Sequence, residues 1–486
     1  MNWLDEHAFH LLLIAVYLGV LVYHAVAANR NVESVNDYLT AGRRLGGVVI
    51  GLSFYATFMS TNTFIGAAGK SWDHGLAWCF GGLVLSGLAL ASWFIVAPKF
   101  VPLTRHYNSL TVADFLGSHY RSEAVRRVAA LIVAFSSVLY LIAIYRGAAL
   151  AVASFLDLPY AVCVLAVLLI VTAYTLAGGF ESVVLTDSLQ GALMLVGAGA
   201  IAMAMWRAGD GVEIFSAIRA QDPKLASASN WAAISASLAY GLAVGVKYLV
   251  EPRQLSRFYG LKDQRALRIA SIVAPLAIIV TYGVLLPLGA MARAIIPPGA
   301  IESSDQVIPY LLGSAELLGP VVGALFLLVL VSAAMSSIDS VLLVAASTID
   351  RDLCRATTTA VSTGATMRDV QWTRAWVVAL SLTAALIALI PGVNDIVKLT
   401  KFSGSLYGAC FVPVLVCGLY IRRSATTALA TMITGTITVI GVFTLRQFGR
   451  TTMQEVYPGM AIGLVLFLLL SQRSGGGDPT ADDVSK

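Results

Sequence analysis

Long apolar runs separated by short polar stretches dominate the pattern of this chain. Most runs contain about 20 residues or more, which is enough for a helix to cross a hydrocarbon core of roughly 30 Å. The regular alternation of apolar and polar residues that membrane barrels require is absent, so the runs predict helices. The 13 predicted spans are residues 9–28, 46–70, 77–98, 126–152, 158–177, 181–206, 231–250, 267–292, 317–349, 372–391, 398–421, 424–445 and 457–472.

The composition places the chain in the same class. Of its 486 residues, 58% are hydrophobic and 12% are charged, whereas charged residues make up about 25% of a typical soluble domain. The predicted fold class is therefore an all-α polytopic membrane protein. We interpret the formal net charge of +5 as a signal of membrane topology and infer no nucleic-acid partner from it.

Basic residues predict how the helices are oriented across the membrane. If the N-terminus lies outside, Lys and Arg are about twice as frequent in the inner loops as in the outer loops, which favours an N-out and C-in topology. The short loops and the lack of a recognisable cleavable signal peptide suit a bacterial inner membrane. The basic residues of the predicted inner loops are Arg30, Arg43, Arg44, Lys99, Arg105, Arg121, Arg126, Arg127, Arg253, Arg257, Lys262, Arg265, Arg268, Arg351, Arg355, Arg368, Arg374, Arg422 and Arg423.

A dense polar cluster interrupts the apolar run at residues 321–349. Ser336, Ser337 and Ser340 fall on one side of a helix and supply hard oxygens at a spacing that suits a small cation. An alternative reading is structural, because serines in membrane helices often bond their own backbone or a neighbouring helix.

Two predicted helices carry polar residues where a membrane helix is normally apolar. The first has the sequence STNT at residues 60–63, and the second contains Tyr240, Lys247 and Tyr248 before Glu251. If the backbone unwinds there, its freed carbonyls need protein, a cavity or a cation as partners. The two segments lie five helices apart, which is the interval expected of an inverted repeat of five plus five helices.

Six blocks in this order resemble the sodium/solute symporters, the family that includes sodium-coupled carriers of proline, galactose, sialic acid, pantothenate and monocarboxylates. The resemblance extends from about residue 35 to residue 420. The blocks are NDYLTAGRRLGG (36–47), ATFMSTNTF (56–64), HYNSLTVADFLGSHY (106–120), GGFESVVLTDSLQG (178–191), EPRQLSRFYGLKD (251–263) and AAMSSIDS (333–340).

The resemblance implies a domain organisation similar to that of LeuT. Two inverted five-helix repeats would occupy residues 46–207 and 230–422, with one extra helix before them at 1–28 and two after them at 424–472. The Gly-rich, acidic segment 473–486 is expected to be a disordered cytoplasmic tail.

The resemblance also implies a sodium site. Its ligands would be the main-chain carbonyls of Ala56, Met59 and Ala333 and the hydroxyls of Ser336 and Ser337. Five neutral oxygens suit a monovalent cation, whereas a divalent ion normally takes carboxylates.

Asp187 is the next ionisable candidate that the resemblance assigns. In the sialic acid branch of the family, the matching aspartate helps to form a second sodium site, and its partners here would be Ser336, Asp339 and Ser340. This chain departs from that branch, because Asp339 stands where the branch has a serine. An alternative for Asp339 is that it caps a helix or pairs with an arginine near the inner end.

The solute pocket of the family lies beside the sodium site and is lined by both broken segments. A cationic side chain there would bind a solute carboxylate. The sequence therefore favours a small organic anion as the substrate. For Arg146, pairing with Asp187 or extension toward the membrane surface is the alternative. The candidate solute-binding residues are Ser60, Thr63, Arg146, Tyr240, Lys247 and Tyr248.

The predicted function is therefore sodium-driven symport of a small organic solute into the cell by alternating access. A proton-coupled carrier of the same architecture, with Asp187 or Asp339 titrating, is the alternative. An enzyme is not expected, because no nucleophile and base pair or phosphate-binding loop appears in a suitable context. We expect Na⁺ as the coupling ion, no organic cofactor, and the solute and the lipid bilayer as partners, without an obligatory protein partner.

Overall fold

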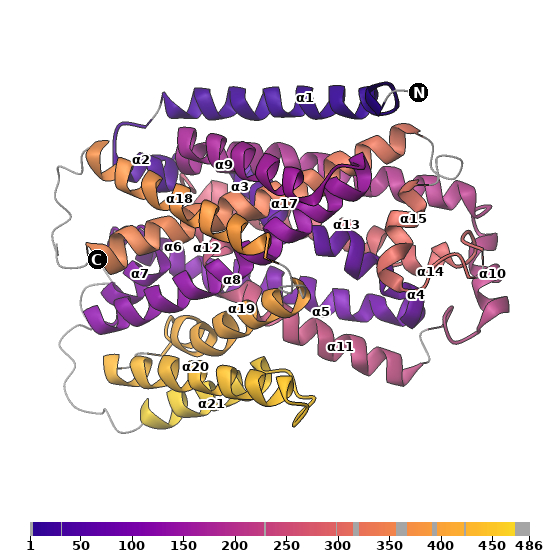
Figure 1. The fold of residues 1–486 in the computed structure, drawn as a ribbon. Coiled ribbons are helices and arrows are strands. Elements are labelled where there is room, and N and C mark those ends of the chain that lie inside the picture. The colour runs from indigo at the N-terminus through magenta and orange to yellow at the C-terminus, as the bar shows by residue number, and fades with distance from the viewer. Residues whose placement is uncertain are drawn as a thin grey trace.

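The computed structural model describes residues 3–30, 32–227, 230–297, 299–313, 320–355, 367–390, 396–421 and 424–471. Throughout these residues the regular structure is helical, apart from one isolated β-bridge between Leu45 and Leu261 (Figure 1). This confirms the all-α class. The predicted tail at 473–486 lies outside the described residues.

The helices vary widely in length. The α-helices are α1 (Trp3–Asn29), α2 (Val35–Thr40), α3 (Gly47–Phe58), α4 (Ser71–His74), α5 (Cys79–Ala91), α6 (Ala97–His106), α7 (Val112–His119), α8 (Glu123–Leu156), α9 (Tyr160–Ala208), α10 (Glu213–Gln221), α11 (Trp231–Gly245), α12 (Pro252–Tyr259), α13 (Gln264–Leu285), α14 (Leu288–Ala292), α15 (Val307–Gly313), α17 (Pro320–Thr348), α18 (Met367–Ala388), α19 (Ile396–Phe411), α20 (Ala425–Gln447) and α21 (Val456–Ser471).

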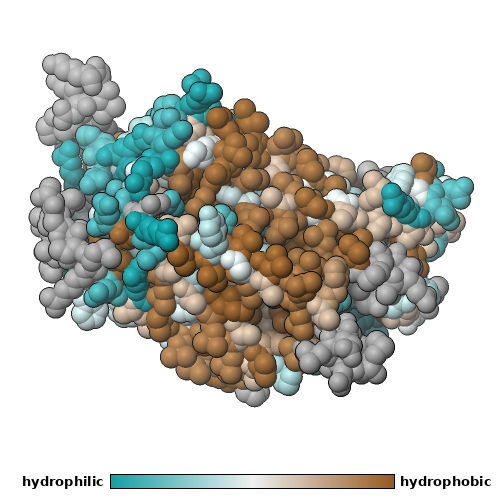
Figure 2. Space-filling view, turned by 90° about the horizontal axis from the view of Figure 1, so that it is seen from above, coloured by the Kyte–Doolittle hydropathy of each residue, from teal (hydrophilic) through white to brown (hydrophobic). Residues whose placement is uncertain are grey.

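Apolar side chains form a belt across the middle of the molecular surface. Figure 2 shows hydrophobic residues across the middle of one face, with hydrophilic residues gathered toward the ends. Leu12, Leu169 and Ile437 are among the exposed apolar side chains of the belt, at 61%, 68% and 65% exposure. Within the described residues, 10 helices are long and apolar enough to cross a membrane. The protein is therefore a multi-pass membrane protein.

Every predicted span overlaps a described helix. The spans 158–177 and 181–206 both lie in α9, which bends sharply at Gly179, where φ is +58°. A side chain is rarely tolerated at this φ, so glycine permits the bend. The number of separate crossings and the N-out orientation remain predictions.

The helix α17 lies at the centre of the bundle. It packs against α8, α9 and α3, while α13 covers another side of α3. The first helix α1 packs on α9, and the C-terminal pair α20 and α21 packs around α19; Figure 1 shows these peripheral helices on opposite sides of the bundle.

Both predicted helix interruptions are confirmed. The helix α3 ends at Phe58, Met59 is extended with φ −72° and ψ 144°, and helical structure resumes at Thr61. The second interruption follows α11, where the chain forms a 3₁₀ turn over Val246–Leu249. The next helix, α12, begins at Pro252, whose missing N–H is harmless at a first helical position.

Two basic residues assigned to the predicted inner loops are buried inside the protein. Arg253 and Arg257 lie in α12 and are 2% and 0% exposed. Arg253 pairs with the buried carboxylate of Glu251 and Arg257 with that of Asp187, and a count of charges along the sequence does not register such pairs. The topology prediction therefore loses two of its supporting charges.

The close packing of α5 and α11 gives a first testable prediction. A Cβ at Gly81 would lie 2.4 Å from the main-chain oxygen of Ser237 on α11. We expect Gly81→Ala to lower the thermal unfolding midpoint of the detergent-purified protein, because forced overpacking typically costs about 1–3 kcal/mol. Gly87→Ala on the same helix is the matched control, because a Cβ there meets nothing within 4 Å. Equal midpoints for the two variants would contradict the close approach.

Candidate sodium and solute sites

The end of α3 and the middle of α17 bring five oxygen-bearing groups together. The hydroxyl of Ser336 lies 3.2 Å from the carbonyl oxygen of Ala56 and 3.3 Å from that of Ala333, and the hydroxyl of Ser337 lies 3.5 Å from the carbonyl oxygen of Met59. All five residues are at most 1% exposed. We call this group the carbonyl–serine cluster.

The helix break explains why these carbonyls are available. In a continuous helix, the N–H of Ser60 would bond to the carbonyl of Ala56; here it donates to Thr63 Oγ1 at 3.4 Å. The last carbonyls of α3 also form the negative end of its dipole. Neutral oxygens at a helix C-terminus, isolated from water, can together coordinate a small monovalent cation.

A second buried cluster surrounds Asp187 on α9. Its Oδ2 atom accepts hydrogen bonds from Ser53 at 2.8 Å and Thr57 at 3.3 Å, and forms an ion pair with the Arg257 guanidinium at 2.5 Å. The same guanidinium nitrogen donates to Ser340. A positive side chain therefore lies between Asp187 and Ser340, two of the residues expected to hold a second sodium.

Asp339 takes neither of its two alternative roles, as a helix cap or as the partner of an arginine near the inner end. Its Oδ2 accepts a hydrogen bond from the Tyr174 hydroxyl at 2.8 Å, and its Oδ1 accepts one from Ser340 at 3.2 Å. It lies in the middle of α17 and is 0% exposed, so it is not a helix cap. Asp187 likewise pairs with Arg257, which corrects the alternative of an Arg146 partner.

A cavity of about 680 Å³ adjoins the carbonyl–serine cluster. Ser337 belongs both to that cluster and to the cavity wall, and the lining extends to His10 and Phe155 near the end of the bundle where α1 begins. Five of the six predicted solute-binding residues line it: Ser60, Thr63, Tyr240, Lys247 and Tyr248.

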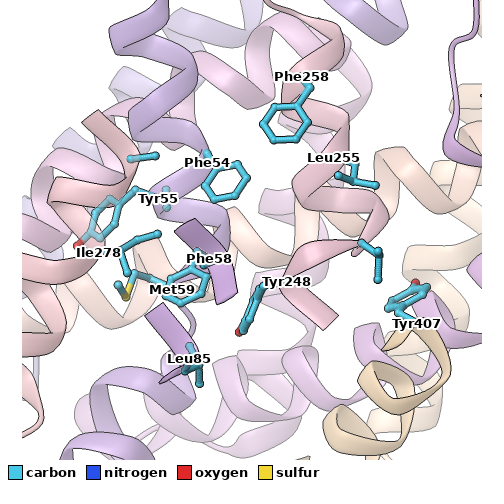
Figure 3. Close-up of a cluster of buried hydrophobic side chains, with 14 of the residues drawn as sticks. Phe54, Tyr55, Phe58, Met59, Leu85, Tyr248, Leu255, Phe258, Ile278 and Tyr407 are labelled. Carbon is cyan, nitrogen blue, oxygen red and sulfur yellow. The ribbon is translucent and has the colours of Figure 1, made fainter. Parts of the chain in front are cut away.

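The two helix breaks meet beside this cavity. Figure 3 shows Phe58, the last residue of α3, beside Tyr248 from the turn after α11, with ring centroids 4.4 Å apart. Both breaks therefore contribute to one wall, as the inverted-repeat reading expected.

Arg146 does not reach the cavity. Its guanidinium donates to the carbonyl of Ala388 at 3.3 Å and lies over the ring of Tyr160. The cavity-facing residues of α8 include Ala143 and Gly147; at about 100° per residue, Arg146 lies off their face. The distribution of apolar residues along α8 does not show which of its faces lines the cavity.

Several residues that line the cavity were not predicted from the sequence. Trp78, Tyr140 and Tyr282 line the cavity, but aromatic residues in an apolar run usually indicate packing. Glu251 and Arg253 were a clearer indication of the site than these aromatic residues, because charged residues next to a predicted helix break need partners inside the protein.

A model of the sodium:solute symporter family matches residues 38–435. This chain belongs to the sodium:solute symporter family. It is thus a transporter rather than an enzyme, and Na⁺ is its coupling ion. The proton-coupled alternative receives no support from the family match.

Curated relatives match this symporter along almost its whole length. It is 27% identical to the osmoregulated proline transporter OpuE of Bacillus subtilis, over 94% of this chain and 93% of that protein. It is also 27% identical to the sodium/pantothenate symporter of Escherichia coli, over 96% of each chain. The sodium/proline symporter of Escherichia coli is 27% identical, over 95% of this chain and 93% of that one.

Solved structures confirm the fold of the symporter. A Na⁺-coupled sialic acid symporter in a substrate-bound outward-open state superimposes with a TM-score of 0.81 at 18% identity, over 95% of this chain and 97% of that chain. MhsT in complex with L-phenylalanine gives a TM-score of 0.58 at 14% identity, over 87% of this chain and 97% of that chain.

The Asp187–Arg257 pair gives a second prediction. Removing one partner leaves the other charge buried and uncompensated, which typically costs about 3–5 kcal/mol. We expect Asp187→Asn and Arg257→Gln each to lower the unfolding midpoint strongly, and the double variant to lose less than the sum of the two losses.

The control for this prediction is Glu123→Gln, which removes the partner of Arg127 in an ion pair whose side chains are 38% and 51% exposed. Glu123 also lies 3.8 Å from Arg126, which keeps its closer partner Asp352 at 2.8 Å. We expect a change of at most about 1 kcal/mol there, because water screens such pairs. Strict additivity of the Asp187 and Arg257 losses would show that the two charges do not interact.

Proposed function

We propose that this symporter couples sodium entry to the uptake of a small organic solute bearing a carboxylate group. The observation that carries the proposal is the position of Lys247. Lys247 lines the cavity and is 5% exposed, and its ammonium nitrogen lies 5.0 Å from the ring centroids of Tyr140 and Tyr248, which also line the cavity. A buried cationic residue in the wall of a solute-sized cavity favours an anionic group in the solute.

The named solutes of the relatives support the same class. Proline, pantothenate and sialic acid each carry a carboxylate, although the rest of each molecule differs. Ser60, Thr63, Tyr240 and Tyr248 supply hydroxyls around the cavity for the remaining polar groups of the solute.

The sodium ion is proposed to bind in the carbonyl–serine cluster. There it joins the end of α3 to α17, next to the cavity wall at Ser337. Because Arg257 already neutralises Asp187, we propose one sodium per cycle. With bound sodium and solute, the repeats at 46–207 and 230–422 rock against each other and transfer both ligands inward.

The charge of the solute sets the driving force. A monocarboxylate carried with one sodium moves no net charge, so only the sodium gradient contributes, at about 1.4 kcal/mol for a tenfold gradient. A zwitterionic solute would add about 2.3 kcal/mol per 100 mV of membrane potential. The predicted accumulation is therefore much larger for a zwitterion than for a simple anion.

Sodium binding can be tested without a known solute. We expect the unfolding midpoint of the purified protein to rise in sodium chloride relative to potassium chloride or choline chloride, because a ligand at 100 times its Kd stabilises the folded state by about 2.7 kcal/mol. The Ser336→Ala/Ser337→Ala variant should lose this rise.

Ser235→Ala/Thr383→Ala is the matched control, because both hydroxyls are on exposed residues and donate within their own helices. A sodium-specific rise that survives in Ser336→Ala/Ser337→Ala would refute the proposed sodium site.

A binding assay distinguishes Lys247 from Arg146 as the residue that binds the solute carboxylate. We expect Lys247→Met to weaken binding of carboxylate solutes by about 10- to 100-fold, the usual loss for a hydrogen bond to a charged group, while the sodium-dependent rise in midpoint is retained. Arg146→Gln should bind normally, since its side chain is not part of the cavity wall. The probes are labelled L-proline, pantothenate and N-acetylneuraminate; the reverse pattern would refute the role of Lys247.

A further inference from the structure

Three buried charged side chains connect the cavity with the carbonyl–serine cluster. Glu251 Oε1 lies 2.7 Å from Arg253 Nε and 3.8 Å from Lys247 Nζ. The three residues are 2%, 2% and 5% exposed, respectively. Because they lie at the second helix break, no continuous helix fixes their spacing.

The two cations reach different sites. Lys247 belongs to the cavity wall. Arg253 Nη1 donates to the hydroxyl of Ser337 at 3.4 Å, and that hydroxyl is 3.5 Å from the carbonyl oxygen of Met59. One carboxylate thus stands between a cation at the cavity and a cation at the proposed sodium ligand.

The local charge is unbalanced. Two cations share the single carboxylate of Glu251, and the ring of Tyr140 lies against both, 4.6 Å from Arg253 Cζ and 5.0 Å from Lys247 Nζ. Among the described residues, Glu251 Oε2 and Arg253 Nη2 have no hydrogen-bond partner, and both residues line a cavity of about 10 Å³, room for about one water. The carboxylate is therefore not saturated by either cation.

We propose that Glu251 is a positioning residue that divides its charge between Lys247 and Arg253 and so links sodium affinity to solute affinity. When a solute anion binds Lys247, Glu251 neutralises Arg253 more completely. The positive potential at Ser337 then falls, and sodium binds more tightly. By linkage, bound sodium favours the solute to the same extent. The solute half of this proposal rests on the proposed function.

The proposal predicts effects of opposite sign for the two members of the pair. Glu251→Gln leaves two unneutralised cations, so sodium should bind more weakly and a carboxylate solute more tightly. Arg253→Gln removes the cation beside Ser337 and leaves Glu251 to Lys247, so sodium should bind more tightly and the solute more weakly. A pair that only holds α12 in place would weaken both ligands in both variants.

The first experiment uses sodium chloride alone and needs no solute. Sodium titrations of the full-length purified protein, with ionic strength held constant by choline chloride, give the sodium concentration at half-saturation. We expect that concentration to rise at least about fivefold in Glu251→Gln and to fall at least about fivefold in Arg253→Gln, the lower end of usual coupling between sites. The double variant should return to within about twofold of the unmodified protein.

The control is Glu455→Gln, which removes the partner of Arg446 at 3.0 Å; the Glu455 side chain is 1% exposed and the Arg446 side chain 32% exposed, and both residues are remote in sequence from the breaks. Its sodium half-saturation should not change. An unchanged or weaker sodium affinity in Arg253→Gln, or a shift in Glu455→Gln of the size expected for Glu251→Gln, would overturn the proposal. If Glu251→Gln does not fold, Arg253→Gln and the double variant still decide the question.

The second experiment repeats the titrations with L-proline, pantothenate or N-acetylneuraminate present. Opposite shifts of solute affinity in Glu251→Gln and Arg253→Gln support the charge-sharing account, whereas shifts of the same sign overturn it. If none of these carboxylates binds the unmodified protein, the proposed solute class fails, while the sodium titrations still test the role of Glu251.

Discussion

A helix interrupted inside a membrane leaves main-chain carbonyls that water cannot reach, and the centre of this protein is arranged around two such interruptions. At the first, the carbonyls of Ala56 and Met59 meet the hydroxyls of α17. At the second, Gly245 and Pro252 bracket a turn that contributes Lys247 and Tyr248 to the cavity. Satisfying these carbonyls stabilises the contact between α3 and α17, and a sodium ion bound there would act on the same contact.

Charge burial is the second constraint, and it follows from the same lack of water. Asp187 and Arg257 form one nearly fully buried ion pair, and Glu251 with Arg253 forms another. Such pairs stabilise a fold only weakly, because desolvation offsets much of their attraction. Their placement beside the carbonyl–serine cluster is better understood through function, since any charge in a low-dielectric interior changes the affinity of its neighbours for an ion.

The sequence was sufficient for the fold because membrane helices are coded locally. A run of about 20 apolar residues has little alternative to a helix in lipid, and STNT at 60–63 was enough to predict a break. It was less reliable for topology, because Arg253 and Arg257 count as loop charges along the chain and are buried in the structure. Local pattern does not reveal a partner that lies tens of residues away.

The sequence by itself determined the helices, the two interruptions, the family blocks and the residue types that suit sodium. Tertiary structure decided which side chains share a site. Lys247 and Arg146 look alike in sequence, but the turn at the second break carries Lys247 to the cavity, whereas the rotation of α8 directs Arg146 toward Ala388. Asp187 likewise gained Arg257 as its partner only when α9 and α12 folded together. Helix rotation and long-range pairing depend on the packing of the whole bundle, which no local pattern encodes.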